Sequence, residues 1–318
     1  MIDFGATMRR HSHLALSTAF RRCRFCIVQA EETVHIQCEF GGCVVWKIHV
    51  IVILIGIGVS WPAASFAQQP AAPAPGEAED LAKKLANPIS DLVSVPFQFN
   101  WEQNVGPSEA TRFILNVQPV MPFALNPDWN LISRVIVPFV SQPALTDGGE
   151  PAFGVGDILA SFFFSPSKPG LTWGVGPAIS LPSTSVPTLG TEKWSAGPTV
   201  VVLKQTGKMT YGVLWNQVWS FSGNTGRADV DQMFLQPFLA YQSTRTVTVT
   251  LQSETTANWE VDEGRWTVPV NVIVGKLSSF GTFPASYQLG FGAFVAHPDI
   301  GPSWKIRGAV VILLPRRR

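Results

Sequence analysis

Charged residues are scarce in this chain of 318 residues. Asp, Glu, Lys and Arg together make up 14% of it, against the roughly 25% that is usual in soluble domains. The formal net charge is only +1, so the composition gives no reason to expect a nucleic-acid partner. Long apolar runs are missing as well: 46% of the residues are hydrophobic, but no stretch of about eighteen apolar residues indicates a membrane helix. Apolar residues that are numerous but dispersed are typical of a β-barrel that faces lipid.

Cysteine is absent beyond residue 43. The four cysteines of the chain, Cys23, Cys26, Cys38 and Cys43, all lie within residues 1–43. The spacing Cys23-x-x-Cys26 occurs in zinc sites and redox centres, but no second pair follows it. We therefore expect no metal site and no cofactor, and we interpret residues 1–43 as an upstream extension that arises from a start codon placed too early.

An export signal is predicted over residues 44–67. Lys47 precedes an apolar run over 48–59, and small residues stand at the −3 and −1 positions of a cleavage site after Ala67. The alternative is a short membrane anchor, for which the run is hardly long enough. We therefore expect a cleaved signal peptide, export to the outer membrane of a Gram-negative cell, and a mature chain that begins at Gln68.

A linker and a short helix are expected over residues 68–92. The first part, 68–78, is rich in proline and alanine, which is typical of a flexible linker. Leu81 and Leu85 then recur at the spacing of an amphipathic helix, which Pro88 should end. Two interpretations of this helix stay open: a frayed lead-in to the first strand, or a plug on the periplasmic side or in the lumen.

Alternation of apolar and polar residues predicts β-strands from residue 93 onward. In the first strand one side carries Val93, Val95, Phe97, Phe99 and Trp101, and the other carries Ser94, Gln98, Asn100 and Glu102. About twelve strands are predicted, at 93–103, 110–122, 129–140, 153–165, 171–182, 193–205, 208–221, 231–242, 245–255, 265–276, 284–296 and 303–314. The predicted fold class is all-β: a transmembrane antiparallel up-and-down β-barrel over residues 93–315, preceded by the short helix.

The connections between these strands alternate in length. Those after the second, fourth, sixth and eighth strands are tight turns, whereas those after the third, fifth, seventh and ninth are longer and polar. Outer-membrane barrels have short periplasmic turns and longer external loops, and a soluble sandwich has no reason to alternate in this way. An even number of strands leaves both ends of the barrel in the periplasm.

Tryptophan and tyrosine mark the strand ends, and both prefer the membrane–water interface because they join an apolar body to a polar tip. We expect two aromatic girdles: Trp129, Trp173, Tyr211, Tyr241 and Tyr287 at the short-turn ends, and Trp101, Trp194, Trp219, Trp266 and Trp304 at the long-loop ends. Prolines remove ladder donors, so bulges or local widening are expected at Pro96, Pro119, Pro138, Pro177, Pro198, Pro237 and Pro269.

Several blocks of the sequence together resemble one bacterial family. LANPISDLVSVPFQFNWEQNVGP, GLTWGVGPAISLPS, FLQPFLAYQS and WTVPVNVIVGKL are similar to the outer-membrane transporter-like proteins grouped with the MetA pathway of phenol degradation, often misnamed bacterial "neuromedin U". The resemblance extends from about Leu81 to Pro315. It implies an outer-membrane barrel loosely related to hydrocarbon and fatty-acid channels, and it carries over no catalytic residue. The chain departs from the pattern at its end, VVILLPRRR, where such barrels usually finish on an aromatic residue.

Little in the sequence indicates an enzyme. After Ala67 one histidine remains, His297, and no serine-nucleophile motif accompanies it. The enzyme alternative is an outer-membrane phospholipase, a family that also has twelve strands. The acidic loop with Glu260, Asp262 and Glu263 raises the alternative of calcium binding, but a solvated loop is the simpler interpretation. We predict no catalytic residue and no metal ligand.

Polar residues on the inner side of the strands are expected to line the lumen. They are Gln98, Asn100, Glu102, Arg112, Asn116, Gln118, Arg134, Thr248, Gln252, Glu254, Arg265, Asn271, Lys305 and Arg307. Bases outnumber acids among them, so the outer mouth should form a basic constriction that favours anionic or carboxylate-bearing solutes. Alternatively, the charge pairs only brace the barrel wall.

The expected strand register pairs some of these charges. A hairpin centred on Pro107 places Glu102 opposite Arg112. The hairpin between the ninth and tenth strands is expected to place Glu254 opposite Arg265. The last strand should close against the first.

These observations predict a monomeric outer-membrane channel or importer through which small solutes, hydrophobic or carboxylate-bearing ones among them, diffuse passively. The expected partners are outer-membrane lipid and lipopolysaccharide, the barrel-assembly machinery and a small-molecule solute. Two alternatives stay open: a closed structural or adhesive surface barrel that transports nothing, and a secreted soluble β-sandwich.

Overall fold

The computed structural model describes residues 75–314, with the exception of Asp91 and Pro169. The expected upstream extension with its four cysteines, the signal peptide and residues 68–74 of the linker lie outside the described residues. The described part contains one α-helix, one short 3₁₀ turn and fifteen strand segments.

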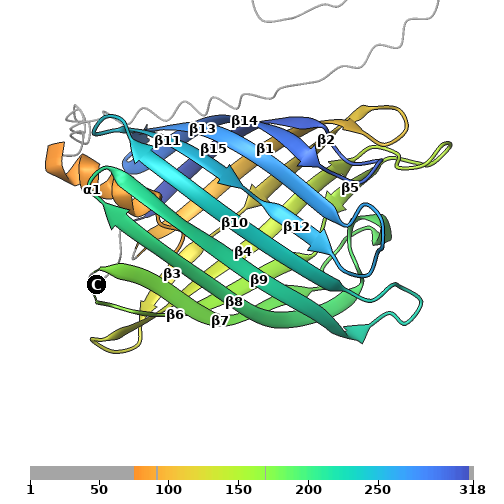
Figure 1. The fold of residues 1–318 in the computed structure, drawn as a ribbon, viewed down its shortest axis with the longest axis horizontal. Helices are drawn as coiled ribbons and strands as arrows, with labels where there is room; N and C mark the ends of the chain where they lie inside the picture. The colour runs from red at the N-terminus through yellow and green to blue at the C-terminus, as the bar shows by residue number, and fades with distance from the viewer. Residues whose placement is uncertain (1–74, 91, 169, 315–318) are drawn as a thin grey trace, which may run out of the picture. The chain divides into compact units, whose positions relative to one another are not determined.

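The strand segments form one closed antiparallel sheet (Figure 1). They are β1 (Val93–Val105), β2 (Ala110–Val117), β3 (Val120–Ala124), β4 (Trp129–Gln142), β5 (Ala152–Val155), β6 (Ile158–Pro166), β7 (Leu171–Leu181), β8 (Lys193–Thr206), β9 (Met209–Gly223), β10 (Asp231–Gln242), β11 (Val247–Ser253), β12 (Thr255–Asn258), β13 (Trp266–Phe280), β14 (Phe283–Ala296) and β15 (Trp304–Leu314). The pairs β2/β3, β5/β6 and β11/β12 are each one strand with a short break, because both halves pair with the same neighbour. The barrel therefore has twelve strands, as predicted, and the soluble β-sandwich is excluded.

The first and last strands close the barrel, as predicted. β1 and β15 pair antiparallel from Val93 opposite Leu314 to Gln103 opposite Trp304, without a register shift. The other neighbours around the wall follow one another in the chain. The start of β1 and the end of β15 therefore lie at the end of the cylinder that carries the short turns. We assign this end to the periplasm, because outer-membrane barrels keep their short turns there.

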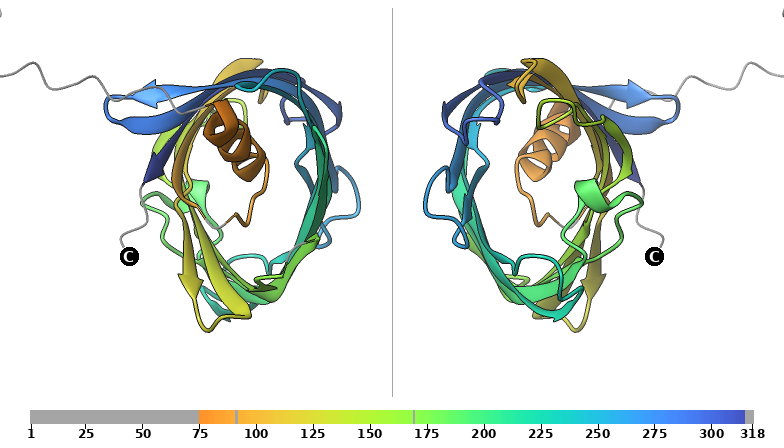
Figure 2. Two further views of the ribbon diagram at one scale, coloured as in Figure 1. Left: turned by 90° about the vertical axis from the view of Figure 1, so that its left-hand side faces the viewer. Right: turned by 90° about the vertical axis from the view of Figure 1, so that its right-hand side faces the viewer.

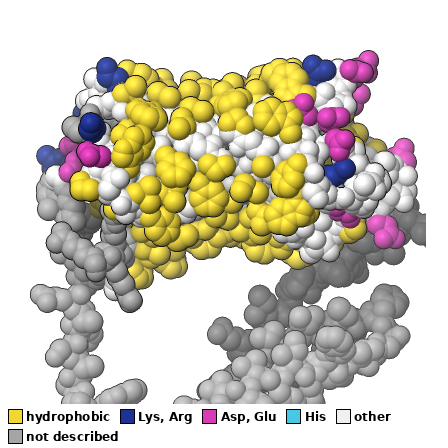
Figure 3. Space-filling model, turned by 90° about the horizontal axis from the view of Figure 1, so that it is seen from below, with side chains coloured by type: hydrophobic (Ala, Val, Ile, Leu, Met, Phe, Trp, Pro, Cys, Tyr) yellow, Lys and Arg dark blue, Asp and Glu magenta, His cyan; other side chains and the backbone are white. Residues whose placement is uncertain are grey.

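Alternating side chains give the wall an inner and an outer face. In β1, Asn100 and Glu102 are buried, whereas Trp101 between them is exposed; in β13, Asn271 is buried and Val272 is exposed. Figure 3 shows the consequence: hydrophobic side chains gather in a band around the middle of the visible wall, with charged ones at its two ends. At ~3.3 Å per residue and a tilt of about 40°, the thirteen residues of β1 span roughly 33 Å, which is enough for a ~25 Å apolar band.

Prolines disturb the sheet at only some of the expected positions. Pro119 lies in the break between β2 and β3, and a register shift precedes Pro269. Pro177 and Pro198, by contrast, lie opposite each other in β7 and β8 without a shift. Since neither has a backbone N–H, their pairing leaves no donor unsatisfied. The expected bulge is also wrong at Pro96, which pairs with β15 in register.

Helix α1 (Pro75–Leu85) lies inside the barrel, at the end with the short turns (Figure 2). It begins within the proline- and alanine-rich stretch that the composition predicts to be a linker, and it ends three residues before Pro88. Ala78 and Ala82 are buried. Among the described residues, no helix is both long and apolar enough to cross a membrane.

The helix and the described residues after it, 86–90 and 92, lie in the periplasmic part of the lumen, and we call residues 75–90 and 92 the plug. Leu81 and Leu85 pack beside Leu277 of β13 and the end of β15. Ile89, which is 3% exposed, inserts into a cluster of side chains from six strands: Val120, Ile132, Phe163, Val201, Leu203, Leu214 and Phe238. A hydrophobic cluster therefore holds Ile89 against the wall at this level of the lumen.

Candidate functional site

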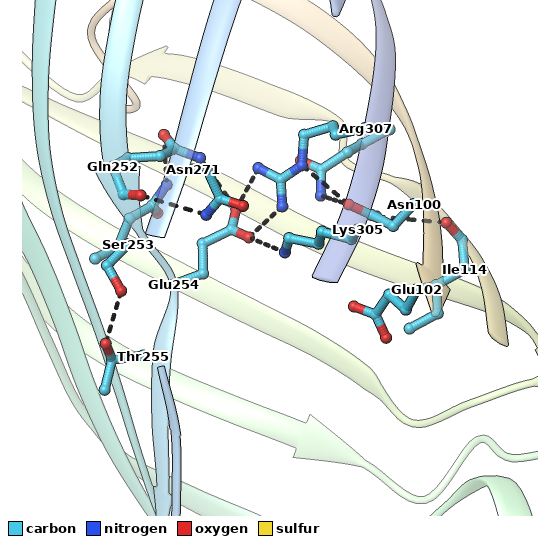
Figure 4. A network of polar contacts seen from close by, with 12 residues as sticks. Asn100, Glu102, Ile114, Gln252, Ser253, Glu254, Thr255, Asn271, Lys305 and Arg307 are labelled. Carbon is cyan, nitrogen blue, oxygen red and sulfur yellow. Dashed lines mark hydrogen bonds and ion pairs between the residues drawn. The ribbon is translucent and has the colours of Figure 1, made fainter. Parts of the chain in front are cut away.

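The outer part of the lumen contains a buried ion network around Glu254, which lies between β11 and β12 (Figure 4). Arg307 Nη1 donates to Glu254 Oε1 at 2.9 Å and Arg307 Nη2 donates to Oε2. Lys305 Nζ donates to Oε2 at 3.4 Å, and Gln252 Nε2 donates to Oε1 at 3.3 Å. Lys305 and Arg307 are 4% and 3% exposed. Each carboxylate oxygen of Glu254 therefore accepts two hydrogen bonds. A buried carboxylate needs such partners, because burial removes it from water.

Two strands, β13 and β14, separate the partners of this network along the wall. On β14, Gly292 pairs with Lys305 and Gly290 pairs with Arg307. A Cβ on Gly292 would lie only 3.1 Å from Lys305 Cγ. Gly292 therefore leaves the space across which Lys305 reaches Glu254.

A chain of amide side chains connects Arg307 with Arg134 along the inner wall. Arg307 Nε and Gln98 Nε2 both donate to Asn100 Oδ1, at 2.9 and 3.4 Å. Gln118 Nε2 donates to Gln98 Oε1 at 3.4 Å, and Arg134 Nη2 donates to Gln118 Oε1 at 2.9 Å. The series runs from β15 through β1 to β4. The acceptor of the Arg134 hydrogen bond is thus a neutral amide, and no carboxylate among the described residues forms an ion pair with Arg134.

Glu102 and Arg112 form a separate ion pair. They lie opposite each other in β1 and β2, as predicted, and Arg112 Nε donates to Glu102 Oε2 at 2.8 Å. Arg112 Nη1 also donates to Gln142 Oε1 at 3.4 Å. Lys305 lies opposite Glu102 in register, as barrel closure predicts, but its ammonium group bonds to Glu254 instead.

The predicted pairing of Glu254 with Arg265 is wrong. β12 and β13 pair Ala257 with Trp266, which centres the hairpin about two residues later than expected. Arg265 lies in the connecting loop, with its guanidinium 5.3 Å from the centroid of the Trp259 ring. It takes no part in the lumenal network, so the predicted ring of bases at the outer mouth is smaller than expected.

The remaining residues predicted to line the lumen lie elsewhere on the same wall. Asn271 is 1% exposed and donates to the backbone oxygen of Gln252 at 3.3 Å, while its Oδ1 is buried without a partner. Thr248 lines a cavity of about 50 Å³ beside helix α1. Asn116 is half-buried on the face of β2 that also carries Arg112.

A larger cavity, of about 190 Å³, lies between the plug and the ion network, and we call it the lumenal cavity. Arg134, Arg307 and Glu254 line its polar part, together with five glutamines: Gln98, Gln118, Gln236, Gln252 and Gln288. Phe238, Val311 and other apolar side chains line the part near the plug. The cavity therefore joins a polar, basic wall to an apolar floor.

The aromatic residues predicted to form girdles lie on the outside of the barrel. Nine of the ten are at least 37% exposed, and Trp173 is half-buried. Trp173 packs edge-to-face against Trp129 of the same rim, with ring centroids 5.9 Å apart. Trp259, which was not among the predicted residues, packs in the same way against Trp266 at 5.6 Å.

Sequence reasoning missed Lys193, a further buried base near the outer rim. Lys193 is 7% exposed, and its Nζ lies 2.9 Å from Asp229 Oδ1 in the loop between β9 and β10. The signal was available, because Lys193 alternates with the exposed Trp194 at the start of β8. Asp157 was also missed; its Oδ2 accepts hydrogen bonds from the backbone and hydroxyl of Thr191, at 2.6 and 2.7 Å.

His297 and the acidic loop form no reactive or metal-binding cluster in the described structure. His297 is half-buried, and its Nδ1 lies 2.8 Å from the backbone oxygen of Pro298. Across the part of the chain that the structure describes, no group of three or more His, Cys, Asp or Glu side chains could hold a metal ion.

Closure of the sheet, the apolar outer band and the polar inner wall define the class: a transmembrane β-barrel of the outer-membrane type. The chain is similar in structure to the COG4313 outer membrane channel from Pseudomonas putida F1, with a TM-score of 0.53 and 14% sequence identity over 70% of this chain and 96% of that chain. At this identity the likeness shows the fold alone, which is that of an outer-membrane β-barrel.

Two other solved structures are more distant. The NanC porin matches with a TM-score of 0.45 and 8% identity, over 70% of this chain and 100% of that chain. Outer membrane phospholipase A from Escherichia coli matches with a TM-score of 0.41 and 11% identity, over 74% of this chain and 98% of that chain. Neither likeness is close enough to add to the argument. No family model and no curated protein matches the sequence.

Proposed function

We propose that the protein is an outer-membrane channel through which small solutes diffuse passively, and that the plug controls its opening. One observation carries the proposal: a polar, charged chamber in the outer part of the lumen ends on a plug that belongs to the chain itself. A wall that served only for stability could fill this chamber with apolar side chains at no cost, because buried ion networks lose much of their energy to desolvation.

The way in which the plug is held suits a part that moves. It is helix and turn, and it adds no strand to the sheet. The wall donates hydrogen bonds to it from Gln205, to Lys83 O at 2.8 Å, and from Gln242, to Glu79 O at 3.4 Å. Apolar packing also anchors it, at Ile89 and at Leu81 and Leu85. The plug can therefore leave the lumen without breaking the β-ladder that closes the barrel.

A closed structural barrel is the second candidate, and the cluster around Ile89 is the observation that favours it. Eight buried side chains, Ile89 among them, meet at this level of the lumen. If this core stays closed in the membrane, solutes cannot pass.

Planar-bilayer conductance of the full chain decides between the two candidates. We expect the wild-type barrel to conduct, and we expect Ile89→Ala to increase the fraction of time spent open. Truncation of a buried isoleucine costs about 2–5 kcal/mol of packing, here packing that only the closed state has. Ile306→Ala is the matched control, because Ile306 is 42% exposed on the outer face of β15.

The outcomes separate the candidates clearly. Absence of conductance from both the wild type and Ile89→Ala would support the closed structural barrel. An equal increase from Ile306→Ala would show that opening does not depend on the plug. Swelling of liposomes loaded with small solutes gives an independent measure of passive diffusion.

A further inference from the structure

The lumenal cavity has an excess of positive charge. Arg134 and Arg307 line it, and Glu254 is the one acid among its described lining residues. Glu254 already accepts hydrogen bonds from Gln252, Lys305 and Arg307, so it has no capacity left for another cation. Charges held away from bulk water need a counter-charge, and the described lining of the cavity sets one carboxylate against two guanidinium groups.

Arg134 is the group that most needs such a counter-charge. A guanidinium carries five N–H donors, and the hydrogen bond that the structure gives Arg134 goes to the neutral amide of Gln118. Arg134 and Gln118 both line the cavity. A guanidinium matches a carboxylate in geometry, because two parallel N–H···O bonds can form at once. Arg134 is therefore placed to bind a carboxylate that enters the cavity.

The rest of the cavity suits the other end of such a ligand. Phe238, Ile273 and Val311 offer an apolar surface near the plug. A cavity of about 150 Å³ lined by apolar side chains holds benzene, and the lumenal cavity measures about 190 Å³. It therefore has room for one ring or a short aliphatic chain together with a carboxylate.

We propose that the lumenal cavity is a binding site for small amphipathic carboxylates, with Arg134 on the carboxylate and the apolar floor against the ring or chain. This inference deepens the proposed channel function, because the bound acid would be a permeating solute. Binding itself, however, is a property of the cavity and can be measured whether or not the barrel conducts.

Isothermal titration calorimetry of the full chain in lipid nanodiscs tests the proposal, with benzoate as the probe. We expect saturable benzoate binding that Arg134→Gln weakens roughly tenfold to a hundredfold, the loss typical of a charge-assisted hydrogen bond. Benzyl alcohol has the ring without the charge, and its binding should change little. The matched control is Arg245→Gln, which removes the same charge from an exposed turn between β10 and β11.

A second variant tests the apolar floor with Arg134 intact. Ala309→Phe places a ring in the space that the ligand would occupy, since Ala309 lines the cavity and is 7% exposed. We expect it to abolish binding of benzoate and benzyl alcohol alike. A heat-dependent gel shift shows whether each variant is folded.

The proposal is overturned if the folded wild type does not bind benzoate, or if Arg134→Gln or Ala309→Phe binds it as tightly as the wild type. It is also overturned if Arg245→Gln loses as much affinity as Arg134→Gln. Conductance without benzoate binding would leave the channel function standing and remove the carboxylate site. Benzoate binding without conductance would do the reverse.

Discussion

Glu254 and Arg307 lie 53 residues apart in the chain and on strands separated by β13 and β14, yet they form a bidentate ion pair inside the barrel. The pair spans the curve of the wall instead of joining neighbours in the sheet. Lys305 and Asn100 complete it from β15 and β1. The network therefore ties together both sides of the place where the barrel closes.

Removal of the charge on Glu254 should destabilise the barrel strongly. In Glu254→Gln, Lys305 and Arg307 keep their charges in a buried place without a carboxylate, which costs about 3–5 kcal/mol. Urea unfolding in lipid vesicles measures the loss. Glu79→Gln is the control, because Glu79 pairs with Lys83 at 3.1 Å on a partly exposed helix surface and its loss should cost about 0.3–0.5 kcal/mol. Equal losses in the two variants would contradict the role given to the network.

Gly292→Ala should disturb the same network without changing any charge. The added Cβ would clash with Asn271 Oδ1 and would also crowd Lys305 Cγ at 3.1 Å, and relieving these contacts should cost about 1–3 kcal/mol. The matched control is Gly308→Ala on β15, where the closest side-chain atom of Trp101 is 3.6 Å away, an ordinary contact. Urea unfolding should show less than about 0.5 kcal/mol for Gly308→Ala. A Gly292→Ala barrel as stable as this control would show that the network does not need a glycine at position 292.

Adjacent residues of β11 test the two faces of the wall. Val249 is exposed on the outer face, so Val249→Arg should cost about 2–4 kcal/mol if it lies near the middle of the membrane. Thr248 faces inward beside helix α1, so Thr248→Arg should lower the stability of the barrel less. The larger side chain should, however, clash with the plug. Unfolding of both variants, together with bilayer conductance, should separate the effects: lower stability for Val249→Arg, more frequent opening for Thr248→Arg. Identical behaviour would mean that the faces are assigned wrongly.

Acid should release the loop between β9 and β10. The ammonium of Lys193 donates a hydrogen bond to Asp229 and, with its positive charge, holds the pKa of that carboxyl below its usual value. A carboxylate with a lowered pKa stabilises the folded state fully above the pKa of the unfolded chain, ~3.9, and this stability is lost as the pH falls through the lowered value. We therefore expect faster backbone hydrogen exchange in residues 224–230 below about pH 4, after correction for the intrinsic rate.

Asp229→Asn is the control for this pH dependence. It removes the titrating carboxylate, so exchange in the loop should be faster at neutral pH and should no longer depend on acid. A wild-type loop that exchanges equally fast on both sides of the transition would show that the contact with Lys193 does not hold it.

Most of the barrel can be predicted from the sequence because its signals are local. Alternation in β1 fixes that Asn100 and Glu102 face one way and Trp101 the other, and the structure agrees. The short connection after β1 leaves little freedom in register, so Glu102 meets Arg112 as expected. The even number of strands, with antiparallel neighbours, then requires that β15 return to β1.

The site is harder to predict, because it depends on contacts between distant parts of the chain. The partners of Ile89 come from six strands, and no local pattern reveals that they share one level of the lumen. The position of Arg265 was predicted wrongly because the connection between β12 and β13 is long enough for more than one register. The contact of Glu254 with Arg307 depends on the curvature of the wall, which does not appear in a pattern of alternation.

The contacts between β1 and β15 also favour correct pairing of these two strands. Arg307 finds Asn100 only when the last strand has met the first, so an open sheet leaves this arginine incompletely bonded. A slip of one residue would turn Arg307 to the opposite face of the strand and toward lipid, where an arginine costs about 2–4 kcal/mol at the midplane and less toward the interface, on the side where Arg307 lies. Misaligned closure is therefore less stable for two reasons: Arg307 loses its hydrogen bond to Asn100 in the lumen, and its charge faces lipid. Arg307 should therefore favour the correct register when β15 pairs with β1 in the last step of barrel formation.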